Sequence, residues 1–196
     1  MGLFQLFGPA EDAEARSLFA SWCHAAGMSL QVDAAGNMFA LRPGSNPTLP
    51  PIAAGSHLDT QPHGGRFDGI SGVLAALEVV ETLNDAGIET EAPIAVINWT
   101  NEEGVRYQPD MMGSLVYAGG MTTEQAHDVI GIDGARFGDE LARIGYLGSV
   151  PCPGATPHAF VELHIEQGPL LEANGVRIGA VTGVQGISWQ EVVIDG

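Results

Sequence analysis

The feature that most constrains the fold is a succession of strand, glycine-rich loop, helix and strand in the first half of the chain. Residues 52–57 (IAAGSH) have the pattern of a short buried strand, and residues 71–87 have a strong helical pattern that stops at Gly87. Residues 93–100 (PIAVINWT) have the pattern of an apolar strand. Neighbouring parallel strands need a long crossover connection, usually a helix, whereas a tight turn joins antiparallel strands. The helix between these two strands therefore indicates that they run parallel. The sequence therefore predicts an α/β domain with a parallel crossover.

Further elements flank this unit on both sides. Residues 10–27 predict an amphipathic helix, and residues 29–33 and 37–43 predict two strands around a short turn. Residues 110–145 favour short helices and loops, whereas residues 159–167 (AFVELHIEQ) favour another strand. Two more strand candidates follow, at residues 177–186 and 187–196.

The charge balance excludes some classes of partner. The net charge is −17, from 24 acidic and seven basic residues, so the surface is expected to repel nucleic acid. No apolar run reaches the ~20 residues of a membrane helix, and the N-terminus lacks the basic region of a secretory signal, so we expect a cytoplasmic protein without a membrane partner. The two cysteines, Cys23 and Cys152, form neither a metal motif nor a disulfide framework.

The first candidate site combines His57, Asp59 and Asp68. Alternate residues of a strand point to the same side, so Asp59 can accept the second N–H of His57 and orient its ring for a metal. Asp68 follows a glycine-rich loop that can turn sharply toward this position. Taken alone, these residues are explained better as a core histidine and a solvated loop aspartate than as a metal site.

Two more candidates follow other strands. Glu102 and Glu103 come directly after residues 93–100, where a pair of carboxylates is costly unless a cation offsets the charge. The second carboxylate can then act as a general base. His164 follows the strand predicted at residues 159–167. Singly, these are an acidic turn and a core histidine, but their shared position at strand ends strengthens the metal interpretation.

Three segments together resemble one family. GSHLDTQPHGGRFDGISGVLAALEVV, NWTNEEGVRYQPDMMGS and ELHIEQGPLLEANGVRIGAVTGVQGISW are similar to segments of the amidase, hydantoinase and carbamoylase branch of the two-metal aminoacylase and carboxypeptidase superfamily. This branch includes N-carbamoyl-L-amino-acid hydrolases, allantoate amidohydrolases and β-ureidopropionases. The resemblance implies an α/β catalytic domain with a mixed, largely parallel sheet flanked by helices.

The resemblance also implies a site with two divalent metal ions, zinc or manganese, with cobalt or nickel as alternatives. It assigns His57 and His164 to the first ion, Glu103 to the second, and Asp68 to a bridge between them. Glu102 becomes the general base that activates water, and Asp59 orients His57. Gln167 is expected to contact a small carbamoyl or ureido substrate, whose C–N bond is hydrolysed with release of ammonia.

The same resemblance implies that much of the enzyme lies beyond residue 196. Residues 1–186 correspond to the N-terminal part of the catalytic domain, and residues 187–196 to the start of a lid and dimerisation domain. We therefore expect a homodimeric parent enzyme and an inactive isolated fragment. Two alternatives remain open: an exopeptidase or aminoacylase of the same superfamily, and a truncated remnant without catalysis.

Overall fold

The computed structural model describes residues 9–184, 186, 188, 190 and 192–194. The chain divides into two compact units, residues 1–165 and residues 166–196. None of the helices in the described ranges is long and apolar enough to cross a membrane.

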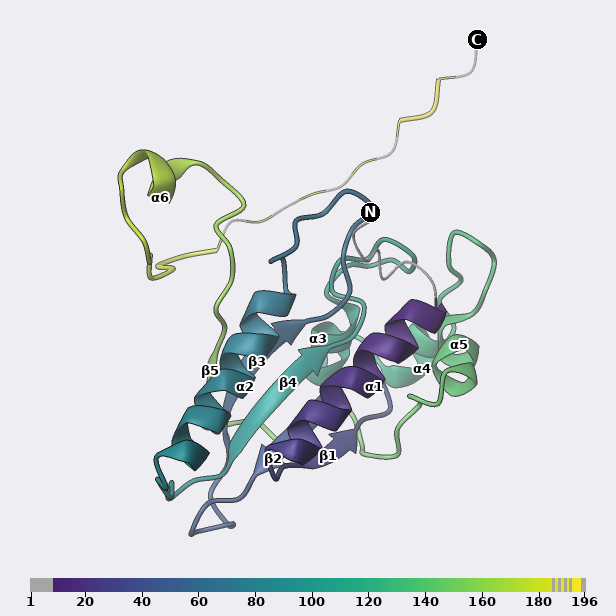
Figure 1. The fold of residues 1–196 in the computed structure, drawn as a ribbon. Helices are drawn as coiled ribbons and strands as arrows, with labels where there is room; N and C mark the ends of the chain where they lie inside the picture. The colour runs from purple at the N-terminus through teal and green to yellow at the C-terminus, as the bar shows by residue number, and fades with distance from the viewer. Residues whose placement is uncertain (1–8, 185, 187, 189, 191, 195–196) are drawn as a thin grey trace. The chain divides into compact units, whose positions relative to one another are not determined.

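A five-stranded mixed sheet forms the centre of the first unit (Figure 1). Its strands, in the spatial order β1-β2-β4-β3-β5, are β1 (Ser29–Val32), β2 (Met38–Arg42), β4 (Ile94–Trp99), β3 (Ile52–His57) and β5 (Ala159–Val161). The pairs β1–β2 and β2–β4 are antiparallel, whereas β3–β4 and β3–β5 are parallel. The predicted mixed sheet is confirmed, with parallel and antiparallel pairs in equal number rather than a parallel majority.

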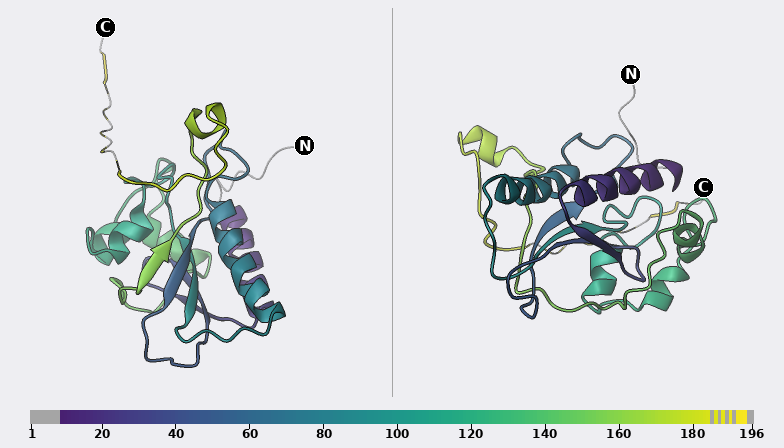
Figure 2. Two further views of the ribbon diagram at one scale, coloured as in Figure 1. Left: turned by 90° about the vertical axis from the view of Figure 1, so that its left-hand side faces the viewer. Right: turned by 60° about the horizontal axis from the view of Figure 1, so that its bottom comes forward.

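Helices cover both faces of this sheet (Figure 2). Helices α1 (Pro9–Ala25) and α2 (Ile70–Asp85) lie side by side on one face, and α2 makes the predicted crossover between β3 and β4. Helices α3 (Met112–Tyr117), α4 (Thr123–His127) and α5 (Phe137–Arg143) lie on the opposite side. Each layer has its own apolar core, the first around Phe19 and Val80 and the second around Met112 and Phe137.

The last strand is shorter than its sequence pattern predicts. Pairing with β3 runs only from Ala159 to Val161, so His164 and its neighbours lie beyond the strand. Beyond Val161 the chain is tied to β3 by a side chain instead, because the Ser56 hydroxyl donates a hydrogen bond of 2.5 Å to Glu162 Oε1.

The second unit contains one short helix, α6 (Leu170–Ala173), among its described residues. The Glu166 carboxylate accepts the main-chain N–H groups of Leu170 and Leu171, which satisfies the free donors at the start of this helix. The two strands predicted at residues 177–186 and 187–196 are not formed by the residues described there, and the remaining positions lie outside the described set. The domain boundary expected after residue 186 falls in the same stretch and stays a prediction.

Candidate metal centre

His57 occupies the carboxyl end of β3, where its side chain is 1% exposed. Its Nδ1 lies 2.8 Å from the main-chain oxygen of Asp59, so this nitrogen donates when it carries the proton. That tautomer leaves Nε2 with a free lone pair. Nε2 is buried and has no hydrogen-bond partner within the described part of the chain, which suits it to binding a cation.

The Asp59 carboxylate accepts hydrogen bonds from the turn that carries Glu102 and Glu103, and not from the imidazole of His57. Its Oδ1 accepts the N–H of Glu102 at 3.2 Å and its Oδ2 accepts the N–H of Glu103 at 3.0 Å. The distance from Asp59 Oδ1 to His57 Nδ1 is 3.7 Å, so the main-chain carbonyl, and not the predicted carboxylate, makes the hydrogen-bonding contact with His57. Asp59 thus links the ends of β3 and β4.

Asp68 and His164 approach His57 from two other segments. Asp68 lies in the loop just before α2, and its Oδ1 is 3.1 Å from His164 Nε2. The rings of His57 and His164 are stacked with centroids 5.9 Å apart. Each of these three residues offers one possible ligand atom, and the three atoms lie within 4.8 Å of one another, as binding to a single metal ion requires.

Two glycines allow this close approach. Gly69 has a φ of +66°, and a Cβ at this position would lie 2.3 Å from the His57 ring. A Cβ at Gly72 would lie 2.4 Å from the carbonyl oxygen of Leu163, next to His164. A side chain at either position would therefore displace the His57 ring or the Leu163 carbonyl next to His164.

Glu102 and Glu103 complete the centre from the end of β4. Glu102 Oε2 lies 3.4 Å from His57 Nε2. Glu103 Oε2 accepts a hydrogen bond of 2.7 Å from Gln61, while its Oε1 is buried and without a hydrogen-bond partner in the described ranges. These two carboxylates and His57 again offer three ligand atoms within 4.8 Å of one another.

Burial and neighbouring charges shift the pKa values of four residues of the centre: His57, Asp59, Glu102 and Glu103. Burial raises the pKa of Glu102 to about 7, against the opposing effect of His57. Burial is also the main reason that the pKa values of Asp59 and Glu103 are raised. Burial acts to lower the pKa of His57, but Asp59 and Glu102 outweigh it and the net pKa is raised. A divalent cation would stabilise the charged form of these buried carboxylates, so the donor set fits a metal.

Comparison with known proteins identifies the family. Residues 53–195 match the model of peptidase family M20/M25/M40. The chain belongs to this family. The match covers His57, His164 and the turn that carries Glu102 and Glu103, and M20 family enzymes use divalent metals.

Individual relatives of the M20 chain agree with the predicted branch. An N-carbamoyl-L-amino-acid amidohydrolase of Rhizobium meliloti is 53% identical over 94% of this chain and 44% of its own length. A ureidoglycolate hydrolase of Arabidopsis thaliana is 34% identical over 95% of this chain and 41% of its own. The crystal structure of a hydantoinase/carbamoylase family amidase from Burkholderia ambifaria superposes with a TM-score of 0.82, at 52% identity over 84% of this chain and 40% of that one. The chain thus spans less than half the length of these relatives.

The structure brings together six of the seven residues proposed from the sequence: His57, Asp59, Asp68, Glu102, Glu103 and His164. Gln167 belongs to the second unit, and its substrate contact stays a prediction. Sequence reasoning missed Gln61, which holds Glu103, although its place beside the His57-Leu58-Asp59 motif was a usable signal. It also missed Ser56 and Glu162, for which the sequence carries no signal.

Proposed function

We propose that this chain supplies the metal-binding part of an amidohydrolase active site. The enzyme would cleave the linear amide or ureido C–N bond of an N-carbamoyl-L-amino acid or an allantoate-type substrate and release ammonia. The observation that carries the proposal is the convergence of two histidines and three carboxylates at the carboxyl ends of β3 and β4. The names of the Rhizobium meliloti and Arabidopsis thaliana relatives support the substrate class.

Two divalent ions, zinc or manganese with cobalt or nickel as alternatives, suit these ligands. We assign His57 and His164 to one ion, Glu103 to the other, and Asp68 to both. When bound, such ions supply Lewis acidity, which makes water a nucleophile near neutral pH and stabilises an oxyanion. The buried free atoms His57 Nε2 and Glu103 Oε1 support this assignment.

Glu102 is the proposed general base. It would take a proton from the attacking water and deliver it to the leaving nitrogen. Without a bound ion, burial raises the pKa of Glu102 to about 7, and a carboxyl group in this range can both accept and donate a proton at neutral pH. Asp59 would keep the base in place through the Glu102 N–H. Gln167 would contact the substrate.

The remaining features of the proposal concern the whole enzyme. Its substrate would be a small molecule, and we expect a cytoplasmic homodimer. The amidohydrolase names of the relatives favour this activity over the exopeptidase or aminoacylase alternative. We expect little turnover from the isolated chain, because it spans 44% of the Rhizobium meliloti relative.

Metal content tests the first half of the proposal. The purified chain would be dialysed against manganese or zinc and then against buffer, and its metal measured by elemental analysis. We expect one or two ions per chain, lost in His57→Ala and retained in His24→Ala, which removes an exposed histidine of α1. A wild-type chain without metal, or one with equal metal in both variants, would reject the site.

A chimera tests the second half. Residues 1–196 would replace the matching 44% of the Rhizobium meliloti relative, and turnover would be measured with N-carbamoyl-L-amino acids, allantoate, N-acyl amino acids and dipeptides. We expect ammonia release from a carbamoyl or ureido compound and its loss in His57→Ala. Preferred cleavage of dipeptides would instead support the exopeptidase.

A further inference from the structure

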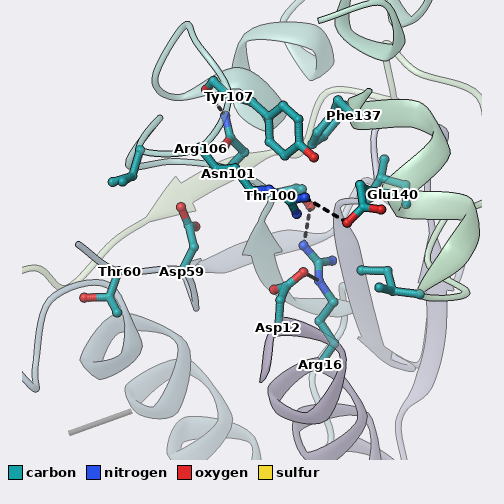
Figure 3. Close-up of a pocket in the computed structure, with 13 residues that line it drawn as sticks. Asp12, Arg16, Asp59, Thr60, Thr100, Asn101, Arg106, Tyr107, Phe137 and Glu140 are labelled. Atoms are coloured by element: carbon teal, nitrogen blue, oxygen red, sulfur yellow. Dashed lines mark hydrogen bonds and ion pairs between the residues drawn. The ribbon is translucent and has the colours of Figure 1, made fainter. Parts of the chain in front are cut away.

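Arg16 is a buried cation that connects three parts of the first unit. It lies in α1 and is only 2% exposed. Its Nε donates to Asp12 at 2.8 Å, its Nη1 to the carbonyl oxygen of Gly36 at 2.8 Å, and its Nη2 to Thr100 Oγ1 at 3.1 Å. Figure 3 shows the side chain reaching from α1 across a small pocket to Thr100, with Asp12 beside it. Arg16 therefore ties α1 to the β1–β2 turn and to the end of β4.

Thr100 is fixed from a second direction. Its N–H donates to Asn37 Oδ1 at 3.0 Å, and its carbonyl accepts the N–H of Gly113 at 2.9 Å. Asn37 is fully buried and donates from Nδ2 to Asp33 and to the Gly113 carbonyl. Each polar group of Thr100 thus has a partner, and the hydroxyl is the one that Arg16 holds.

The acidic turn starts directly after this fixed residue. Asn101 adopts a φ of 53°, and its Nδ2 donates to the carbonyls of Tyr107 and Pro109. Glu102 and Glu103 follow, with their N–H groups on the Asp59 carboxylate. The turn is consequently held at Thr100 on one side and at Asp59 on the other, and a shift at Thr100 would move both glutamates.

We propose that Arg16 is a positioning residue, which sets the place of Glu102 and Glu103 through the hydroxyl of Thr100 and thereby the affinity of the centre for a divalent ion. The inference rests on the proposed function, because it assumes that Glu103 and its neighbours bind metal. Residues that hold ligands in place commonly change metal affinity by 10- to 100-fold when altered. A purely structural Arg16 would affect the stability of the chain and leave the turn unchanged.

The test uses two substitutions of Thr100 in the 196-residue chain. Thr100→Val keeps the volume and loses the acceptor, whereas Thr100→Ser keeps the hydroxyl. Titration calorimetry with Mn²⁺, well below the melting temperature of each variant, should show about tenfold weaker binding for Thr100→Val and about wild-type binding for Thr100→Ser. Arg16→Lys, which keeps the charge but loses the forked donors, should also weaken binding.

Phe19→Leu is the matched control for stability, because Phe19 is a buried residue of α1 that belongs to the apolar core. It should lower the melting temperature and leave Mn²⁺ affinity unchanged. Equal affinities in Thr100→Val and Phe19→Leu would overturn the inference.

Hydrogen exchange separates this inference from the proposed function. The amides of Glu102 and Glu103 should exchange faster in Thr100→Val than in Thr100→Ser, whether or not metal binds. Unchanged exchange overturns the positioning role even if wild-type chain binds Mn²⁺. Faster exchange in a chain that binds no Mn²⁺ supports the positioning of the turn and rejects the metal centre instead.

Discussion

Nε2 of His57 and Oε2 of Glu102 lie 3.4 Å apart, although His57 ends β3 and Glu102 lies in the turn after the parallel strand β4. The residue proposed as a metal ligand and the residue proposed as a base therefore share one small volume. Their roles differ in a way that substitution can separate, because a ligand is needed for binding and a base is needed for proton transfer.

Glu102→Gln should abolish turnover and spare the metal. The amide keeps the size of the side chain but cannot accept a proton, so we expect a loss of at least about 100-fold in kcat for the chimera with the Rhizobium meliloti relative. Elemental analysis of the same preparation should show unchanged metal. Near wild-type turnover with metal in place would show that Glu102 is not the base.

Gly69→Ala should damage the centre more than an equally strained glycine elsewhere. Its Cβ would lie 2.3 Å from the His57 ring, and a φ of +66° adds a cost of about 1 kcal/mol for a residue with a side chain. Gly87→Ala is the matched control, with a φ of +63° and no atom within 4 Å of its Cβ. Both variants should melt at lower temperature, but only Gly69→Ala should lose Mn²⁺ binding. Loss of binding in both would contradict the steric explanation.

Gln61→Leu should weaken metal binding without loss of stability. The exposed Gln61 donates to Glu103 Oε2 at 2.7 Å and leaves the other oxygen for a cation. Without this donor we expect about tenfold weaker Mn²⁺ binding in a calorimetric titration. His63→Ala, an exposed change in the same loop, is the control, and an equal loss there would point to the loop as a whole.

Glu140→Gln should remove an acid-sensitive part of the stability. Hydrogen bonds from Arg143 and Arg106 lower the pKa of Glu140 from 4.5 to about 2. A depressed carboxyl pKa stabilises the fold above pH 4.5, and this contribution disappears as the pH falls toward 2. At pH 7 we expect Glu140→Gln to cost about 1 kcal/mol and to lower the melting temperature by about 2–4 °C.

The difference between Glu140→Gln and wild type should shrink as melting is followed from pH 5 to pH 3. Glu81→Gln, an exposed change on α2, should show no such trend. A difference that stays constant across this range would mean that the Arg106 and Arg143 contacts do not depend on the charge of Glu140.

Local sequence patterns sufficed for the crossover and for the placement of three candidate site residues at strand ends. The alternation of β3, α2 and β4 is visible in hydrophobicity alone, and His57, Glu102 and Glu103 stand at the strand ends that such a crossover brings together. The sequence assigned Asp59 to orient His57 by side-chain alternation. Because β3 ends at His57, alternation does not fix the direction of a side chain two residues later, and this role stays a prediction.

Contacts between residues far apart in the chain could not be predicted from the sequence, for a different reason. The strand predicted at residues 159–167 stops at Val161, where pairing with β3 ends and the Ser56–Glu162 contact takes over. Arg16 and Thr100 are brought together only by the docking of α1 on the sheet. No periodicity in either segment reports on its partner, so such contacts require the folded structure.

Because the pairing of β5 with β3 is short, a bound cation would also help to hold β5 in the sheet. Only three residue pairs join β5 to β3, yet the ring of His164 must stay beside that of His57, which is about a hundred residues earlier in the chain. A cation bound by both imidazoles would be a reversible cross-link between these two parts of the chain, comparable to a disulfide between two distant cysteines. Chelation would then loosen residues 159–165 first, and a protease would detect this as cleavage next to β5 before the rest of the sheet unfolds.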